Sequence, residues 1–159
     1  ARGETTVKGG GRGICPKGWH IPTDREWAQL LDKVEDDGTG TTFTVSQTSN
    51  GWWGTDAGKK LKSSKVLPDA NADNAPADGS WNDHANKGTD DYGFGAVPPG
   101  HRHHNGVQFY NRGTSVHYWN STVGGSNSAW YRSLYYDNAL SLRTDSRRSF
   151  GLSVRCVRD

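Results

Sequence analysis

The chain has 159 residues, the usual length of one domain with a single hydrophobic core. Leu, Ile, Val and Phe occupy only 24 positions, yet the 17 aromatic side chains, seven of them Trp, and the net charge of +2 argue against a disordered chain. Apolar runs are only a few residues long, which excludes a helix that spans a bilayer and predicts no membrane insertion. We therefore expect a folded, loop-rich domain whose core is more aromatic than aliphatic.

The two ends of the chain carry its only cysteines. Residues 1–13 lack the apolar core of a signal peptide and are interpreted as a linker or the trimmed edge of a mature chain, ahead of a single domain over residues 14–159. Cys15 and Cys156 are too few and too far apart in sequence to indicate a zinc cluster. A disulfide between them would close nearly the whole chain into one loop, with a nominal stabilisation of about 5 kcal/mol. Two unrelated buried thiols are the alternative that the sequence leaves open.

The clearest predicted element is a helix that begins after Thr23 and ends by Gly38. Thr23 and Glu26 have the spacing of a capping box, in which the hydroxyl and the carboxylate each satisfy a backbone N–H. Apolar residues at helical spacing predict one buried stripe, formed by Trp27, Leu30, Leu31 and Val34. A weaker helical segment is predicted over residues 56–63, with Leu61 as its main buried side chain.

Short strands and long loops are predicted for the rest of the chain. Residues 68–93 are dominated by Asp, Asn, Ala and Gly and show no periodicity, which predicts a long loop. The predicted strands are residues 106–110, 114–119, 129–135, 140–143 and 150–157. In the last strand, alternation places Leu152, Val154 and Cys156 on one face, as in a sheet packed on one side. Together the elements predict an α+β fold of short antiparallel strands, one or two helices and long loops.

Two segments carry side chains that could bind a metal ion. His101, His103 and His104 follow a Pro-Pro-Gly turn, but no Cys or Glu lies nearby to complete a site, so we interpret them as a solvated turn. The acidic loop has three residues at the spacing of calcium ligands, namely Asp69, Asn71 and Asp73. An EF-hand is excluded because Asn74 and Ser80 replace the Gly and Glu that it requires. We predict no metal and no cofactor, with a looser calcium site in this loop as the alternative.

Catalysis and nucleic-acid binding have little support. No Ser lies in a Gly-flanked nucleophile elbow, and the glycine run over residues 9–13 has neither a strand before it nor a helix after it. Residues 101–159 carry eight Arg and three acidic residues, but the Arg are scattered singly and form no basic stripe. The sequence therefore predicts a non-enzymatic domain with no nucleic-acid partner.

The segment from His117 to Phe150 is instead typical of a binding surface. It mixes Tyr, Asn, Asp and Arg with Ser, Thr and Gly, as adaptable paratopes do, because Tyr offers a large contact area at small entropic cost. The alternative is that tyrosines on short strands simply pack over a sheet. The candidate ligand-binding residues are Tyr118, Asn120, Tyr135, Tyr136, Asp137, Asn138, Arg143 and Asp145.

Six blocks, in order, carry a resemblance to a known family. They are Cys-Pro-Lys-Gly-Trp-His-Ile-Pro-Thr (15–23), Glu-Trp (26–27), Gly-Phe and Ala-Val-Pro (93–98), Tyr-Trp-Asn-Ser-Thr (118–122), Ala-Trp-Tyr-Arg (129–132) and Gly-Leu-Ser-Val-Arg-Cys-Val (151–157). From about Gly13 to Asp159 the chain resembles the Fibrobacter succinogenes major paralogous domain. The resemblance implies a C-type lectin-like fold, in which the paired chain ends would bring Cys15 and Cys156 together.

That fold is shared with formylglycine-generating enzymes and with the variable proteins of diversity-generating retroelements. The enzymatic chemistry is not carried over, because no free cysteine pair occurs in the C-terminal half. Retroelement mutagenesis of Asn-type codons never yields Lys, Glu, Gln, Met or Trp. Residues 117–159 contain none of the first four, and their only Trp, Trp119 and Trp130, belong to the family blocks. Asn120 stands where the family commonly has Ser.

The resemblance therefore implies a receptor or adhesin module that displays a variable surface. It would lie outside the cell, on a bacterial surface or a phage particle, with an extracellular macromolecule or glycan as partner. We expect the rigid scaffold to consist of the Cys15–Cys156 bridge with Trp19, Trp27, Trp119 and Trp130. The alternative is a structural interaction domain of a bacterial surface protein, without a ligand of its own.

Overall fold

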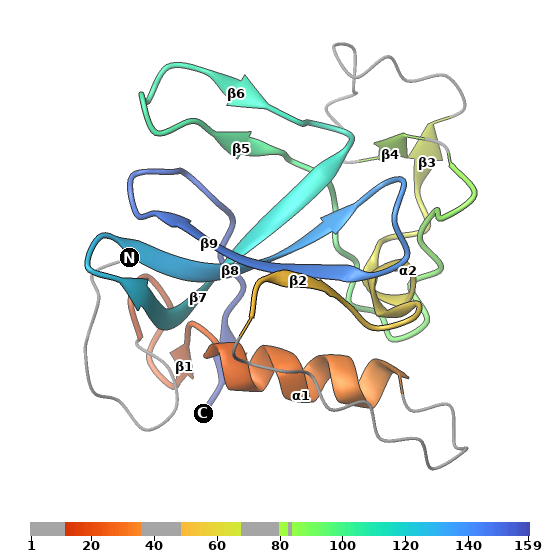
Figure 1. Cartoon of the computed structure of the whole chain (residues 1–159). Helices are drawn as coiled ribbons and strands as arrows, with labels where there is room; N and C mark the ends of the chain where they lie inside the picture. Colours follow the sequence, from red (N-terminus) through yellow and green to blue (C-terminus); the bar gives the residue numbers. More distant parts are fainter. Residues whose placement is uncertain (1–11, 36–48, 68–79, 83) are drawn as a thin grey trace.

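The computed structural model describes residues 12–35, 49–67, 80–82 and 84–159. Within these ranges the fold is mixed, with two helices and small, mostly antiparallel sheets (Figure 1). The helices are α1 (Asp24–Glu35) and α2 (Ala57–Leu61). The strands are β1 (Trp19–His20), β2 (Gly51–Trp53), β3 (Val66–Leu67), β4 (Trp81–Asn82), β5 (His101–Arg102), β6 (Phe109–Tyr110), β7 (Ser115–Gly125), β8 (Ser128–Tyr135), β9 (Ser141–Arg147) and β10 (Val157–Arg158). Neither described helix is long and apolar enough to cross a membrane.

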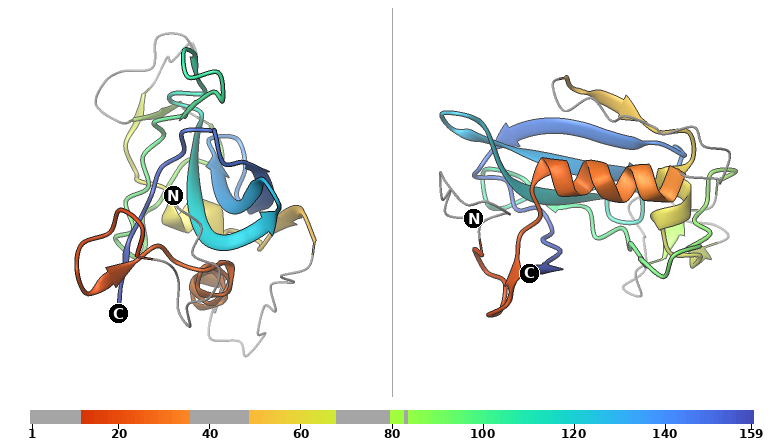
Figure 2. Two further views of the ribbon diagram at one scale, coloured as in Figure 1. Left: turned by 90° about the vertical axis from the view of Figure 1, so that its left-hand side faces the viewer. Right: turned by 90° about the horizontal axis from the view of Figure 1, so that it is seen from below.

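The largest sheet has the strand order β2-β9-β8-β7, and all its neighbours are antiparallel. Helix α1 lies along one side of this sheet, and the β5–β6 hairpin stands on the other (Figures 1 and 2). The strands predicted over residues 114–119, 129–135 and 140–143 are confirmed. Strand β7 continues to Gly125 through register shifts after Trp119, so its polar second half shows no simple alternation.

Three of the other predicted elements need correction. The segment 106–110 pairs only at Phe109–Tyr110. The strand predicted over residues 150–157 is wrong for most of its length, because only Val157–Arg158 forms a strand. Before it, Gly151 bridges Arg102 and Ser153 bridges Tyr118, so the segment passes between two partners and follows neither. The predicted loop over residues 68–93 contains strand β4, which pairs in parallel with β3, and residues 68–79 and 83 lie outside the described part.

The predicted capping box of α1 is confirmed. The Thr23 backbone N–H donates to Glu26 Oε2 at 2.7 Å, and the Glu26 N–H donates to Thr23 Oγ1 at 3.2 Å. Of the predicted stripe, Leu30 is half-buried, and the fully buried members are Trp27, Leu31 and Val34. Helix α2 is confirmed in a shorter form than the predicted 56–63. At Gly58 a Cβ atom would lie 2.3 Å from the Leu140 carbonyl oxygen, so this close approach requires glycine.

The core lies between α1, α2 and the sheet, and it is mixed in character. Trp27 stacks on Tyr118, with ring centroids 5.5 Å apart. Trp81 is fully buried, and its indole N–H donates to the Ala96 carbonyl oxygen at 2.9 Å. Eight aliphatic side chains complete the cluster, namely Ala28, Leu31, Val34, Ala57, Leu61, Ala96, Val116 and Leu134. The expectation of a mainly aromatic core is therefore wrong, because Trp19 and Trp52 remain about 40% exposed.

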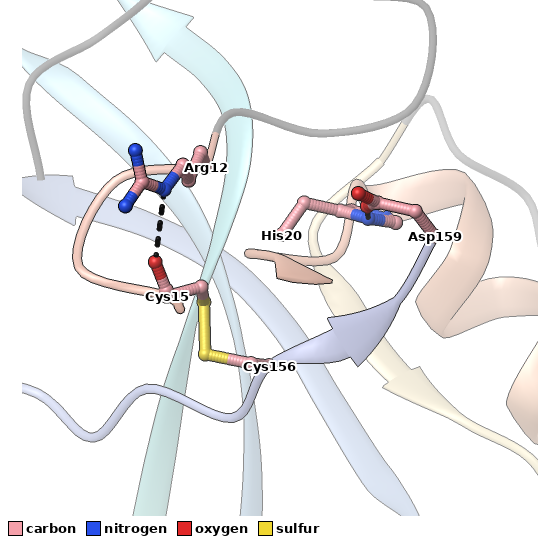
Figure 3. Close-up of a disulfide and its surroundings, with 5 residues drawn as sticks. All are labelled: Arg12, Cys15, His20, Cys156 and Asp159. Carbon is pink, nitrogen blue, oxygen red and sulfur yellow. Dashed lines mark hydrogen bonds and ion pairs between the residues drawn. A yellow bond between two sulfur atoms is a disulfide. The ribbon is translucent and has the colours of Figure 1, made fainter. Parts of the chain in front are cut away.

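The disulfide between Cys15 and Cys156 is present, with the Cα atoms 5.8 Å apart (Figure 3). It lies beside the β1–β10 pair, in which His20 is opposite Val157. His20 Nδ1 lies 2.6 Å from Asp159 Oδ1, and its Nε2 lies 2.9 Å from Glu26 Oε1. Burial disfavours the imidazolium, but the hydrogen bonds to Asp159 and Glu26 outweigh burial and raise the pKa of His20. His20 thus joins the paired chain segments to the first turn of α1.

Candidate functional site

The eight predicted binding residues do not form one surface. Tyr118, Asn120 and Arg143 are only 6%, 2% and 2% exposed, so they present almost no area to a ligand. Asp137 is exposed, and the remaining four are partly buried, namely Tyr135, Tyr136, Asn138 and Asp145. Four of the eight, Tyr135 to Asn138, are consecutive, from the last residue of β8 into its connection to β9.

Asn120 and Arg143 belong to an ionic cluster at the start of α1. Its centre is Asp24, which is 3% exposed and whose Oδ1 accepts from Arg132 Nη2 at 2.9 Å. Asn120 Nδ2 donates to the same oxygen at 3.3 Å, and Arg143 Nε donates to Oδ2 at 2.8 Å. The cluster thus ties the first turn of α1 to β7, β8 and β9 through charge-assisted hydrogen bonds. These two predicted binding residues make internal contacts.

Tyr118 is a core residue. Its ring packs between Trp27 and Phe94, and burial raises the pKa of its hydroxyl although the nearby Arg155 opposes this. For Tyr118, therefore, the alternative interpretation of a tyrosine packed over a sheet describes the structure. A strand pattern indicates which residues share a face, but it does not indicate that α1 covers that face.

At the β8–β9 connection two aromatic side chains from elsewhere in the chain join the predicted residues. Trp52 of β2 meets Tyr135 edge-to-face at 5.4 Å, and His84 meets Tyr136 edge-to-face at 5.6 Å. Trp52 is 42% exposed, and His84 and Asp137 are also exposed. We call these five residues the turn surface. Sequence reasoning missed Trp52 and His84, because the β2–β9 pairing and the fold of the loop bring them here, and the only local cue was a Trp pair between glycines.

A buried lysine holds the backbone beneath the turn surface. Lys62 Nζ donates to the carbonyl oxygens of Tyr135 at 2.6 Å and Asn138 at 2.9 Å, and to that of Asn86 at 2.6 Å. Lys62 is fully buried, which lowers its pKa to about 8, while Asp137 opposes the shift. At neutral pH its ammonium is therefore mostly charged and can use all three donors. No pattern in the sequence singled out this residue.

A recess lies on the α1 side of the sheet, near the start of β8. This cleft has a volume of about 460 Å³, and we call it the helix cleft. The Arg143 guanidinium stacks over the Trp130 ring, 3.5 Å from its centroid. Residues of three strands and the helix line the cleft, including Arg25, Glu26, Gln29, Thr122, Trp130 and Arg143. Sequence reasoning assigned Trp130 to the scaffold and did not consider the helix residues.

The three histidines of the predicted turn lie on the far side of the sheet from α1. His101, His103 and His104 gather around Phe150, with ring centroids 5.2 to 5.8 Å from it. Buried His117 contacts Ser133 Oγ at 2.6 Å through Nδ1, and burial lowers its pKa to about 4. In the described ranges no three metal-binding side chains lie close enough to share an ion. The candidate calcium ligands Asp69, Asn71 and Asp73 fall outside the described residues.

Comparison with known proteins adds a family match. The model of the Fibrobacter succinogenes major domain family matches residues 5–158 and so covers nearly the whole chain. It extends eight residues further towards the N-terminus than the resemblance that begins at about Gly13. No curated protein and no solved structure gives a significant match.

Proposed function

This chain belongs to the Fibrobacter succinogenes major domain family, and on that premise we propose that it is a non-enzymatic ligand-binding module of receptor or adhesin type. The observation that carries the proposal is the turn surface, where Tyr135 and Asp137 lie on a backbone segment held by Lys62 and reach solvent beside Trp52 of β2. Aromatic rings on a fixed backbone supply large contact area at small entropic cost. The expected ligand is an extracellular macromolecule or glycan, not a nucleic acid.

We further propose a C-type lectin-like fold and an extracellular location, on a bacterial surface or a phage particle. The paired strands β1 and β10 and the Cys15–Cys156 bond join the two ends of the described chain, which supports this fold. Disulfides persist mainly in oxidising compartments, which supports a position outside the cytosol. Both statements go beyond the family match itself.

The proposed contact set differs from the eight residues that the sequence indicated. Tyr118, Asn120 and Arg143 are left out because they are buried, and Asn138 and Asp145 are left out because they do not belong to the turn surface. Trp52 and His84 are added because they complete the turn surface. If a retroelement diversifies the domain, variation is expected on the turn surface. There, Lys62 binds main-chain carbonyl oxygens, which every residue type provides.

A structural interaction domain is the second candidate, and the β5–β6 hairpin favours it. Val107 and Phe109 on this hairpin are 76% and 74% exposed, and Tyr110 is 43% exposed. Apolar side chains so far from the core are expected to pack against a neighbouring domain of the same surface protein. In this case the hairpin, rather than the turn surface, carries the contact.

A combined glycan and extracellular-protein array separates the two candidates. We expect at least one ligand whose affinity falls about tenfold or more in Trp52→Ala and in Tyr135→Ala, because exposed aromatic residues act as anchors. Phe109→Ala is the matched control and should bind as the wild type does. The proposal fails if no ligand binds, or if Phe109→Ala removes the binding and the two turn variants keep it.

The proposal includes neither a catalytic residue nor a cofactor, and calcium is the one ion worth testing. The Asp- and Asn-rich segment over residues 68–93 is where the sequence offers a looser calcium site. We expect a chelator to leave the thermal midpoint unchanged. A midpoint that falls with chelator and recovers with added Ca²⁺ would instead assign a calcium site to the domain.

A further inference from the structure

We propose that the helix cleft is a second binding site and that it takes an uncharged saccharide. Its volume of about 460 Å³ falls in the range of about 300–1,000 Å³ that is usual for small-molecule sites. Trp130 at the cleft and Tyr135 at the turn surface are five residues apart on β8, a distance of about 17 Å along an extended strand. The inference therefore does not rest on the turn surface.

The apolar wall of the cleft is the indole of Trp130. Its ring is only partly exposed and borders the cleft, while Arg143 stacks over it at 3.5 Å. Arg143 covers one face of the indole, so the C–H face of a pyranose would pack against the part of the ring that remains exposed at the cleft. The remaining edges of such a ligand would carry hydroxyl groups, which need partners that both donate and accept.

The opposite wall supplies such partners from α1 and β7. Arg25 and Gln29 are one helical turn apart and exposed, so their guanidinium and amide groups can turn towards a ligand. The Gln29 amide both donates and accepts, as vicinal hydroxyls require. The Thr122 hydroxyl accepts from the Asp24 N–H at 2.9 Å and keeps its own proton to donate. The cleft thus combines one aromatic face with a few convergent polar groups.

The charges of the lining favour an uncharged ligand over an anion or a cation. Two basic side chains, Arg25 and Arg143, are balanced by two acidic ones, Asp24 and Glu26. Both acids already accept hydrogen bonds from protein groups: Asp24 from Arg132 and Arg143, and Glu26 from Thr23 and His20. Their oxygens are therefore poorly placed to attract a cation, and their charge opposes a ligand carboxylate at Arg25.

The walls of the cleft are held in place before any ligand arrives. The Asp24 cluster fixes Arg143 and the first turn of α1, and the capping box fixes the backbone from Thr23 to Glu26. A rigid site loses little side-chain freedom on binding, so even a small ligand can retain useful affinity.

The test uses two-dimensional NMR of the whole chain, titrated with cellobiose, maltose, lactose and diacetylchitobiose up to about 20 mM, where even weak sites fill. We expect at least one of them to shift the Trp130 indole N–H signal while the Trp52 signal stays in place. A carboxylated disaccharide, digalacturonate, should bind more weakly than its uncharged counterpart. The proposal is overturned if none of the four moves the Trp130 signal, or if digalacturonate binds more tightly than all of them.

Variants then locate the site. Gln29→Ala and Arg25→Ala change exposed side chains that the fold does not need, and each should weaken binding of the responding disaccharide about fivefold or more. Trp130→Ala should abolish binding. The amide signals of the paired strands β1 and β10 show whether this variant is folded. Trp52→Ala is the matched control, because it removes an exposed Trp of the turn surface. Equal weakening by Trp52→Ala would move the saccharide to the turn surface and overturn the assignment to the cleft.

Discussion

The middle and the C-terminal end of strand β8 are held by different kinds of contact. In the middle, the side chain of Arg132 binds the Asp24 carboxylate together with that of Arg143 from β9, so the identity of each residue matters. At its end, Lys62 binds the main-chain carbonyl oxygens of Tyr135 and Asn138, which any residue would provide. The difference indicates that the middle of β8 is constrained in sequence, whereas the turn can change its side chains and keep its position.

The largest effect on stability is expected at the Asp24 cluster. Asp24→Ala leaves Arg132 and Arg143 buried without their carboxylate, and breaking such a buried pair costs about 4 kcal/mol of unfolding free energy. Urea denaturation measures it, and Asp91→Ala, which changes an exposed carboxylate, is the control and should stay within about 0.5 kcal/mol of the wild type. Equal stabilities of the two variants would contradict the central role of Asp24.

A slightly smaller effect is expected at the main-chain end. Lys62→Met preserves the apolar stem but removes the donor for three carbonyl oxygens, which should lower the unfolding free energy by about 3 kcal/mol. Hydrogen exchange should show faster exchange of the amides over residues 135–140, with the amides of α1 unchanged. Uniform acceleration across the domain would show that Lys62 supports the whole core and not the turn in particular.

The stability of the domain should also depend on pH through buried His117, which contacts Ser133 of β8. The pKa of His117 is lowered to about 4, so between pH 6.5 and 4 the unfolded chain takes up a proton that the folded chain does not. Stability should therefore fall as the pH falls through this window, by up to about 3 kcal/mol. Denaturation at pH 7, 5.5 and 4.5 measures the slope, and His117→Gln should reduce it.

His20 gives the opposite sign. Its pKa is raised in the folded chain, so its contribution is complete below the unfolded value and is lost as the pH rises through the folded value. The wild type should therefore lose a little stability as the pH rises above about 6.5, and His20→Gln should not show this loss. The same loss in His20→Gln would assign it to another group.

The smallest effects on stability are expected for two matched side-chain truncations. Asp137→Ala on the turn surface should change stability by less than about 0.5 kcal/mol, because the turn is held through its backbone. Asn120→Ala removes a buried amide that binds Asp24, and it should cost about 2 kcal/mol. Thermal or urea denaturation of the two variants measures both stability changes. A larger loss in Asp137→Ala would contradict the view that the turn tolerates changes of sequence.

Local chemistry allowed several elements to be predicted from the sequence. The Thr23–Glu26 capping box located α1, because both of its hydrogen bonds form within four residues. The ordered family blocks indicated the family and the approach of Cys15 to Cys156, which the family match and the disulfide confirm. Strands β8 and β9 were predicted from short strand-like runs separated by turn residues, a signal that depends only on neighbouring residues.

Other features depend on contacts between distant segments, which no local pattern contains. Alternation places Tyr118 and Asn120 on the same face of β7, but only the packing of α1 and the Asp24 cluster buries both. No local pattern distinguishes Lys62 from other lysines, and only the fold places three carbonyl oxygens around it. The sequence by itself therefore determined the family, the main helix and the disulfide. The tertiary structure alone decided which polar residues face solvent, because burial depends on what each strand packs against.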